Sequence, residues 1–307
     1  AYGPVWKEGG ERGVYKSEDG GLTWKNVKSV SQYTGCNDLL IDPKNPKVLY
    51  AAFHQRMRKV FTYIGGGPES AVFKSIDGGI NWKKIEGLPS GDIGRIGIAI
   101  SSIKSEVLYA VVEAKEDKGG IYRSKDSGVS WTKMSSTFTS GNYYQEIDCD
   151  PHDVNKIYIT DTYYKVSYDG GKTVSNLGEI NKHIDNHAIW VDPKDPNHLL
   201  VGCDGGIYET YDHAKTWDFK SNLSITQFYK VSTDNAYPFY NVHGGTQDNC
   251  SFGGPSRTTS INGITNSDWF VTSIGDGFES QVDPTDPNII YAQSQYGGLV
   301  RYDHSNG

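Results

Sequence analysis

The sequence has few sulfur-containing residues. Its 307 residues include only 4 cysteines and 2 methionines. The cysteines lie far apart, no two form a CxxC pair, and no histidine stands at zinc-finger spacing, which argues against a zinc module. We interpret them as buried structural thiols on strands, while a disulfide between two of them stays open. The four are Cys36, Cys149, Cys203 and Cys250.

Long apolar runs and basic blocks are also missing. No stretch approaches the roughly 20 apolar residues that a membrane-spanning helix needs, so we predict no membrane insertion. The 30 Lys and Arg residues are outnumbered by 37 Asp and Glu residues, and the net charge of -7 is spread along the chain. This balance argues against nucleic acid as a partner. Residues 1–7 show no charged start followed by an apolar run, so no signal peptide is visible.

Glycine and tyrosine are abundant instead, with 36 and 21 residues. Glycine serves tight turns, and tyrosine suits the pleated, half-buried surface of a sheet. The composition therefore indicates an all-β protein.

One phrase, Ser-x-Asp-x-Gly-x-x-Trp, recurs along the chain. In it, Asp can hold a tight turn by accepting backbone N–H bonds, and Gly supplies a positive φ. The Trp ring is expected to fold back and pack beside the turn. In the fourth copy Val174 replaces Trp, and in the fifth Ala214 replaces Gly. The copies are Ser17, Asp19, Gly21 and Trp24; Ser75, Asp77, Gly79 and Trp82; Ser124, Asp126, Gly128 and Trp131; Ser167, Asp169 and Gly171; and Thr210, Asp212 and Trp217.

A second phrase alternates with the first. It ends one strand with Asp-Pro and starts the next, as in Ile41-Asp42-Pro43 followed by Val48-Leu49-Tyr50. Together the phrases predict four short strands per unit, recurring at the length of a propeller blade. We therefore predict an all-β fold, a β-propeller of four-stranded blades with Asp-box hairpins. About six blades are expected in residues 1–307, taken as one segment of a longer multi-domain chain whose further sequence completes the ring.

The Asp-box phrase resembles the hallmark of the BNR-repeat propellers. With stretches such as Gly244-Gly245-Thr246-Gln247-Asp248-Asn249, the chain is similar to their sortilin-like and glycosyl-hydrolase-like bacterial branch. The resemblance implies a secreted, periplasmic or cell-surface bacterial protein. The Asp-boxes themselves are interpreted as structural, because one copy in each blade is what folding requires and not what a single active site requires.

The mouth of a central channel is the better place for a ligand. Residues four to seven positions before each Asp-Pro phrase are expected to approach the propeller axis, where loops converge. Their mixture of carboxylates, an Arg, a His and aromatic rings suits a sugar or a peptide, although they could also satisfy one another around a water-filled channel. The candidates are Asp38, Asp92, Arg95, Tyr144, Glu146, Asp185, His187, Phe228 and Asp276.

Three functions remain open on these residues. A module that binds a glycan or a protein at the channel mouth is the leading interpretation. The alternative is a glycoside hydrolase that uses two channel carboxylates, and the third is a scaffold of a surface or secretion assembly. No catalytic residue can be assigned. On a strand, His183, Asp185 and His187 would share one face as metal ligands could, but this alternation describes any polar strand, so we predict no metal and no cofactor.

Overall fold

The computed structural model describes residues 1–223 and 225–306. The chain divides into two compact units, one spanning Ala1–Phe219 and the other starting at Lys220. Each unit is described by itself. The described residues contain β-strands and two short 3-10 helices but no α-helix, and none of their helices is long and apolar enough to cross a membrane.

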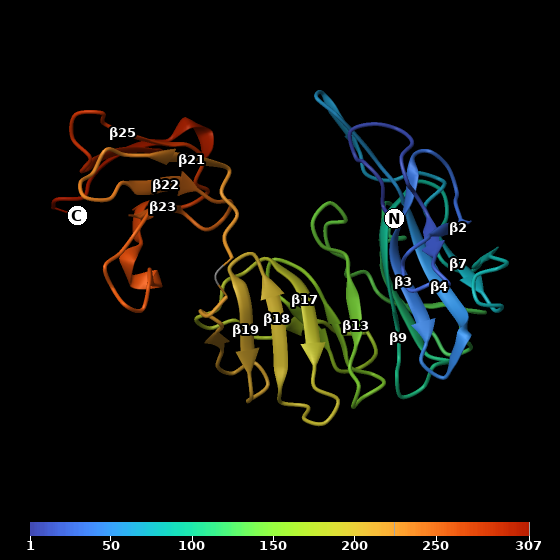
Figure 1. Ribbon diagram of the computed structural model, residues 1–307. Helices are drawn as coiled ribbons and strands as arrows, with labels where there is room; N and C mark the ends of the chain where they lie inside the picture. The colour runs from blue at the N-terminus through green and yellow to red at the C-terminus, as the bar shows by residue number, and fades with distance from the viewer. Residues whose placement is uncertain (224, 307) are drawn as a thin grey trace. The chain divides into compact units, whose positions relative to one another are not determined.

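Unit 1 contains four four-stranded antiparallel sheets and two hairpins (Figure 1). The sheets are β3-β4-β7-β8, β9 to β12, β13 to β16 and β17 to β20. The strands are β1 (Val14–Lys16), β2 (Lys25–Lys28), β3 (Thr34–Asp42), β4 (Asn45–Gln55), β5 (Met57–Lys59), β6 (Thr62–Ile64), β7 (Ala71–Ser75), β8 (Lys83–Lys84), β9 (Ile93–Ile100), β10 (Leu108–Ala114), β11 (Gly120–Ser124), β12 (Thr132–Ser135), β13 (Ile147–Cys149), β14 (Ile157–Ile159), β15 (Lys165–Ser167), β16 (Ser175–Asn176), β17 (Asn186–Val191), β18 (Leu199–Cys203), β19 (Gly206–Thr210) and β20 (Asp218–Phe219).

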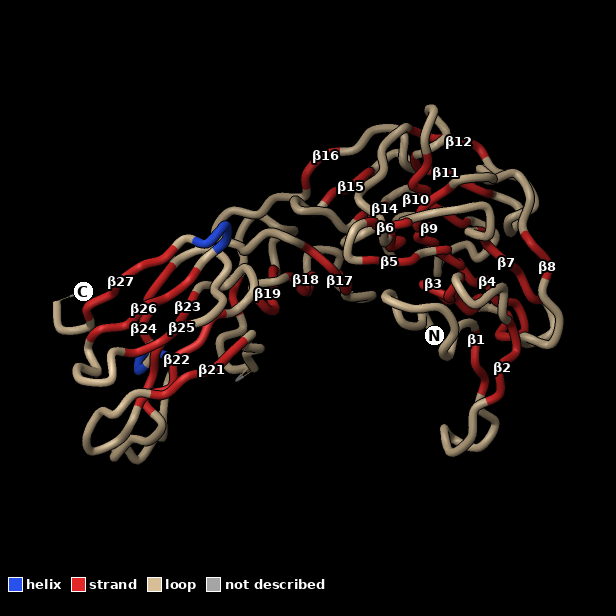
Figure 2. The backbone as a smooth tube through the Cα atoms, turned by 90° about the horizontal axis from the view of Figure 1, so that it is seen from above, coloured by secondary structure: helices blue, strands red, loops and turns tan. Residues whose placement is uncertain are grey.

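Unit 2 contains one four-stranded and one three-stranded antiparallel sheet (Figure 2). Their elements are β21 (Lys230–Thr233), β22 (Asn241–Gly245), β23 (Ser251–Pro255), the 3-10 helix η1 (Asn266–Asp268), β24 (Phe270–Ser273), β25 (Ser280–Val282), β26 (Ile289–Gln293), the 3-10 helix η2 (Gln295–Gly297) and β27 (Leu299–Asp303). In every sheet the strands pair in chain order, which is the meander of a propeller blade. The prediction of an all-β propeller fold is thus confirmed, whereas completion of a ring stays a prediction.

Antiparallel order gives each blade two distinct edges, meaning here the two sides where its strands begin and end and not its outermost strands. Neighbouring strands run in opposite directions, so the start of the first strand and the connection from the second to the third lie at one edge. We call this the mouth edge. The turn after the first strand and the Asp-box turn between the third and fourth strands lie at the opposite edge, which we call the Asp-box edge.

The cores of unit 1 lie between successive blades, because the middle strands are apolar on both faces. On β10, Leu108 and Val112 pack toward the blade before, while Tyr109 and Val111 pack toward the blade after. Along β14, the same alternation places Tyr158 in the core toward the blade after, and Ile157 and Ile159 in the core toward the blade before. A strand buried on both faces reads as a continuous apolar run, and its period of two assigns each side chain to one of the two cores.

The Asp-box turns have a repeated hydrogen-bond pattern. In the third copy, the Ser124 hydroxyl donates to Asp126 Oδ1 at 2.7 Å, and the backbone N–H of Ser130 donates to the same oxygen at 2.9 Å. The Gly128 N–H donates to Ser124 Oγ at 2.9 Å. Hydrogen bonds from the Ser130 side chain and backbone and from Ser124 lower the pKa of Asp126 to about 2. The carboxylate is therefore fully engaged in holding its turn.

The Trp residues of the boxes do more than pack beside their own turns. Trp24 and Trp82 do donate to the carbonyl oxygens of Gly21 and Gly79, at 3.1 and 3.0 Å. Trp217, however, donates to the carbonyl oxygen of Gly178 in the preceding blade at 3.0 Å and is only 9% exposed. The Trp217 ring therefore also joins one blade to the next, a role that the sequence pattern did not indicate.

All four cysteines are half-buried free thiols. Burial raises the pKa of the Cys36 thiol to about 11 and raises the pKa of the Cys149 thiol further. These values suit packing residues and not reactive nucleophiles.

Candidate functional site

Most of the candidate residues lie where the first strand of a blade begins, at the mouth edge, whereas Asp38 lies in the middle of its strand. Asp38 lies within β3, Arg95 lies within β9, and Glu146 directly precedes β13. The nine candidates fall into a group of seven in unit 1 and a group of two, Phe228 and Asp276, in unit 2. The two groups are described one at a time.

An acidic cluster links the first three blades of unit 1. Asp38 Oδ2 accepts the backbone N–H of Ile98 at 3.0 Å, which connects β3 to β9. Arg95 on β9 forms an ion pair with Glu146 and donates from Nη1 to the carbonyl oxygen of Tyr144 at 2.7 Å. Burial, followed by the charge of Glu146, raises the pKa of Asp38 to about 6. The Arg95 guanidinium thus lies within a partly buried group of carboxylates.

Asp148 belongs to the same cluster, although the sequence analysis did not select it. Burial, then the charges of Asp38 and Glu146, raise its pKa to about 7. The rule that selected positions four to seven before the Asp-Pro phrase stops at Glu146, two residues earlier. Residues two apart share a face of a strand, so this alternation was the signal that could have found Asp148.

A second group surrounds Tyr144. Its hydroxyl donates to Asp185, and its ring stacks on that of His187, with centroids 5.6 Å apart and an interplanar angle of 24°. His187 Nε2 in turn lies 2.8 Å from Asp204 Oδ1. Burial, followed by the hydrogen bond to Asp185, raises the pKa of Tyr144 to about 12. The structure thus brings Tyr144, Asp185 and His187 together.

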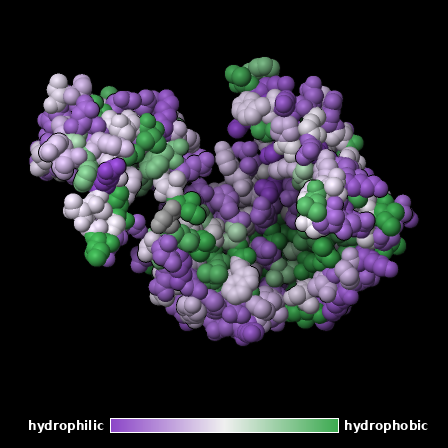
Figure 3. Space-filling view, in the orientation of Figure 1, coloured by the Kyte–Doolittle hydropathy of each residue, from purple (hydrophilic) through white to green (hydrophobic). Residues whose placement is uncertain are grey.

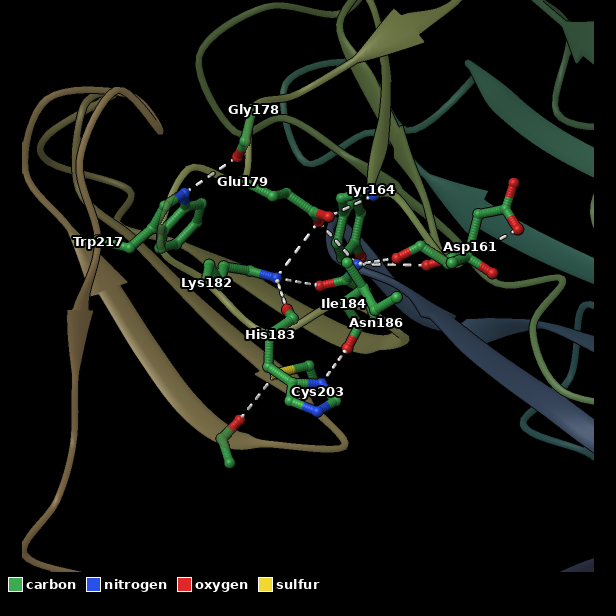
Figure 4. A network of polar contacts seen from close by, with 12 residues as sticks. Asp161, Tyr164, Gly178, Glu179, Lys182, His183, Ile184, Asn186, Cys203 and Trp217 are labelled. Atoms are coloured by element: carbon green, nitrogen blue, oxygen red, sulfur yellow. Dashed lines mark hydrogen bonds and ion pairs between the residues drawn. The ribbon is translucent and has the colours of Figure 1, made fainter. Parts of the chain in front are cut away.

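A buried ion pair underlies the loop that carries Asp185 and His187 (Figure 4). Lys182 Nζ lies 3.3 Å from Glu179 Oε1 and donates to Asn186 Oδ1 at 2.5 Å. Asn186 Nδ2 donates to Glu179 Oε1 at 2.7 Å, and both charged side chains are almost fully buried. Breaking such a pair would leave an uncompensated buried charge, so this network fixes the start of β17.

The structure contradicts the idea that His183, Asp185 and His187 share one face of a strand. The strand begins only at Asn186, and Asp185 has a left-handed backbone with φ of 63°. His183 Nδ1 lies 2.9 Å from the carbonyl oxygen of Ile184, while His187 faces Asp204. Among the described residues, no group of three or more His, Cys, Asp or Glu side chains is arranged to hold a metal ion.

Two further features complete the unit 1 site. Asp92 is exposed just before β9 and takes no part in the contacts described above. Asp38 also lines an open cleft of about 540 Å³, shared with Asn37, Trp24 and Tyr15. Figure 3 shows a hollowed face on unit 1 where hydrophilic and hydrophobic residues adjoin. The residues that line the cleft therefore offer both polar groups and apolar surface.

The candidates of unit 2 lie on loops that contact one another through hydrogen bonds and stacked rings. Asp276 Oδ1 accepts the backbone N–H of Asp248 at 2.6 Å, and its Oδ2 accepts Gln295 Nε2 at 2.6 Å. The ring of Phe228 stacks on that of Trp269, with centroids 6.2 Å apart. The contacts of Asp276 show that Gln247-Asp248-Asn249 forms part of a latch between two blades.

Comparisons with known proteins give distant likenesses. No protein-family model matches the chain. The chain is 24% identical to xyloglucanase Xgh74A of Acetivibrio thermocellus over 150 residues, which cover 39% of this chain and 17% of that protein. It is 23% identical to a xyloglucanase of Hypocrea jecorina over 222 residues, which cover 69% of this chain and 24% of that protein. The chain thus spans less than a quarter of the length of these curated relatives.

Solved structures give likenesses of the same kind. An ancestral GH74 enzyme has a TM-score of 0.48 at 13% identity, covering 95% of this chain and 43% of the other. YCF48 bound to a D1 peptide has a TM-score of 0.44 at 10% identity, covering 89% of this chain and 80% of the other. At these values the structural likenesses add nothing to the fold described above, and the sortilin-like resemblance stays a prediction.

Proposed function

We propose that unit 1 binds a polysaccharide at its mouth edge. The observation that carries this proposal is the acidic cluster of Asp38, Arg95, Glu146 and Asp148, together with the stacked pair of Tyr144 and His187 in the same unit. Aromatic faces stack on the C–H faces of a sugar ring, while carboxylates and a guanidinium bind its hydroxyl groups. A few convergent polar groups beside apolar surface are typical of ligand sites.

Hydrolysis of the bound glycan is the second candidate function. Asp38 and Asp148 have pKa values of about 6 and 7, so at neutral pH the pair can present one protonated and one ionised carboxyl group. Glycosidases use such a division between an acid and a base or nucleophile. This pair is a sharper basis for hydrolysis than the sequence alone offered.

Xyloglucan is the first ligand to test, because both curated relatives described above are named as xyloglucanases. A secreted, periplasmic or cell-surface bacterial location fits a polysaccharide ligand and belongs to the same proposal. A glycosyl-hydrolase-like, sortilin-like origin of the chain belongs to it as well. A peptide ligand and a scaffold role are the outcomes to expect if no glycan binds.

The test is depletion of the full chain from solution by insoluble or immobilised xyloglucan, with other plant, algal and bacterial polysaccharides alongside. Arg95→Met and Tyr144→Ala should each weaken binding about tenfold or more, because each removes a charged or aromatic contact. Tyr168→Ala is the matched control, since Tyr168 is 54% exposed in an Asp-box turn at the opposite edge. Equal binding by all four proteins would refute the unit 1 site.

The same samples separate binding from hydrolysis through the release of reducing ends. A hydrolase should lose turnover in Asp38→Asn or Asp148→Asn while it still binds xyloglucan. Binding by the wild type without any release would leave a binding module and reject the hydrolase.

A further inference from the structure

Unit 2 has a stacked aromatic pair outside the group of nine candidate residues. The rings of Tyr229 and Phe278 stack face to face, with centroids 5.3 Å apart and an interplanar angle of 4°. Tyr229 directly precedes β21 and Phe278 lies two residues before β25, so both stand at the mouth edges of their blades. Tyr229 is 51% exposed and Phe278 is half-buried, so the Tyr229 ring is open to solvent.

Polar side chains lie around this pair. The Tyr229 hydroxyl donates to Gln247 Oε1 at 2.9 Å, and Gln247 itself is exposed. The charges of Asp276 and Asp248 also act on the Tyr229 hydroxyl. The amide and the two carboxylates come from the β22–β23 connection and the start of β25, which antiparallel order places at one edge.

Main-chain bonds hold these loops in a fixed arrangement. The Tyr229 N–H donates to the carbonyl oxygen of Gly245 at 2.9 Å, and the Gly245 N–H donates to that of Phe278 at 3.2 Å. The Phe278 N–H then donates to the carbonyl oxygen of Gln293 at 3.1 Å. The rings therefore rest on four backbone segments that these bonds connect, and binding would require little ordering of the loops.

We infer that the stacked pair of Tyr229 and Phe278, with Gln247, Asp248 and Asp276, is a second saccharide-binding site, carried by unit 2 alone. It takes an uncharged sugar chain: a pyranose ring lies against the aromatic face while its hydroxyl groups bind the amide and the carboxylates. Lys230, the residue after Tyr229, forms an ion pair with Glu279 at 2.7 Å. The charges of Asp248 and Asp276, which act on the Tyr229 hydroxyl, would repel an anionic sugar placed on the aromatic pair.

This inference rests on the proposed function only for the class of ligand, and its residues are distinct from those of unit 1. The experiment is calorimetric titration of the full chain with neutral xyloglucan oligosaccharides, and separately with oligogalacturonate as the anionic probe. The wild type should bind the neutral probe at two sites. Tyr229→Ala should remove one site or weaken it about tenfold, the effect of losing one aromatic stack.

Matched variants control for folding and for the nature of the contact. Gln247→Ala changes only an exposed side chain and should weaken the same site several-fold, with the thermal unfolding of unit 2 unchanged. Tyr291→Ala, at a position 38% exposed on β26 of the same unit, should leave both sites intact. Tyr144→Ala should remove only the unit 1 site.

The outcomes separate the two proposals. If Tyr229→Ala and Gln247→Ala both fold and titrate like the wild type while Tyr144→Ala loses binding, the unit 2 site is wrong and the unit 1 site stands. If only the unit 2 variants lose binding, the unit 1 proposal fails and this inference stands. Tighter binding of oligogalacturonate than of the neutral probe at the unit 2 site would overturn the assigned ligand class.

Discussion

The two units build the same kind of blade by different means. In unit 1 each repeat supplies an Asp-box turn and middle strands that are apolar on both faces, so consecutive blades share continuous cores. In unit 2 the connection between β23 and β24 holds the 3-10 helix η1 in place of an Asp-box turn. There, the backbone N–H of Thr265 donates to Asp268 Oδ2 at 2.7 Å.

Unit 2 relies on glycines that let aromatic rings approach the backbone. A Cβ added at Gly254 would lie 2.4 Å from the Trp269 ring, and one at Gly253 would lie 2.5 Å from the Phe270 ring. A buried polar network supports this packing: Asp234 accepts the N–H of Asn241 at 2.7 Å and lies 3.3 Å from His243 Nε2. Unit 1 thus repeats the same turn in each blade. The shape of unit 2 depends instead on close contacts at single glycine positions.

The largest effect is expected where an Asp-box Trp joins two blades. Trp217→Ala should reduce the free energy of unfolding of unit 1 by about 3–5 kcal/mol, because it empties a buried position between blades. Trp24→Ala should cost less than about 1 kcal/mol, since that ring is 63% exposed. Thermal and urea unfolding of both variants measures the difference. Equal losses would mean that these rings stabilise only their own turns.

A smaller effect should separate unit 2 from unit 1. Gly254→Ala should destabilise unit 2 by about 1–3 kcal/mol, because the new methyl group would force the Trp269 ring to move. Gly202→Ala is the unit 1 control, since its added Cβ would meet only the Ala188 methyl group at an ordinary 3.7 Å. Differential scanning calorimetry should show that the unfolding transition of unit 2 shifts in Gly254→Ala, while Gly202→Ala unfolds like the wild type. A shift of both transitions would show that the units unfold together.

Much of the fold could be predicted because it follows from local chemistry. The Asp-box phrase specifies a turn that its own side chains close, and the Asp-Pro phrase marks the end of a first strand. Val231-Ser232-Thr233-Asp234 resembles the Asp-Pro phrase without its proline, and it likewise stands at the end of a first strand, β21. These features need no knowledge of distant residues.

The site was harder to predict because it depends on residues far apart in sequence. The pKa of Asp148 is raised by burial and by the charge of Asp38 from another blade, and the stack of Tyr229 on Phe278 joins residues from two blades. The alternation of His183, Asp185 and His187 suggested a shared face, but the left-handed backbone at Asp185 breaks it. Spacing alone reveals neither spatial contact nor a local change of backbone.

Hydrogen exchange of the full chain, with and without saturating xyloglucan oligosaccharides, tests the central claim most directly. The account predicts slower exchange in residues 93–98, 142–148 and 183–187 at the mouth edge of unit 1, with unchanged exchange in the Asp-box turns. Slower exchange confined to the Asp-box turns, or no change at any mouth edge, would contradict a glycan site in unit 1.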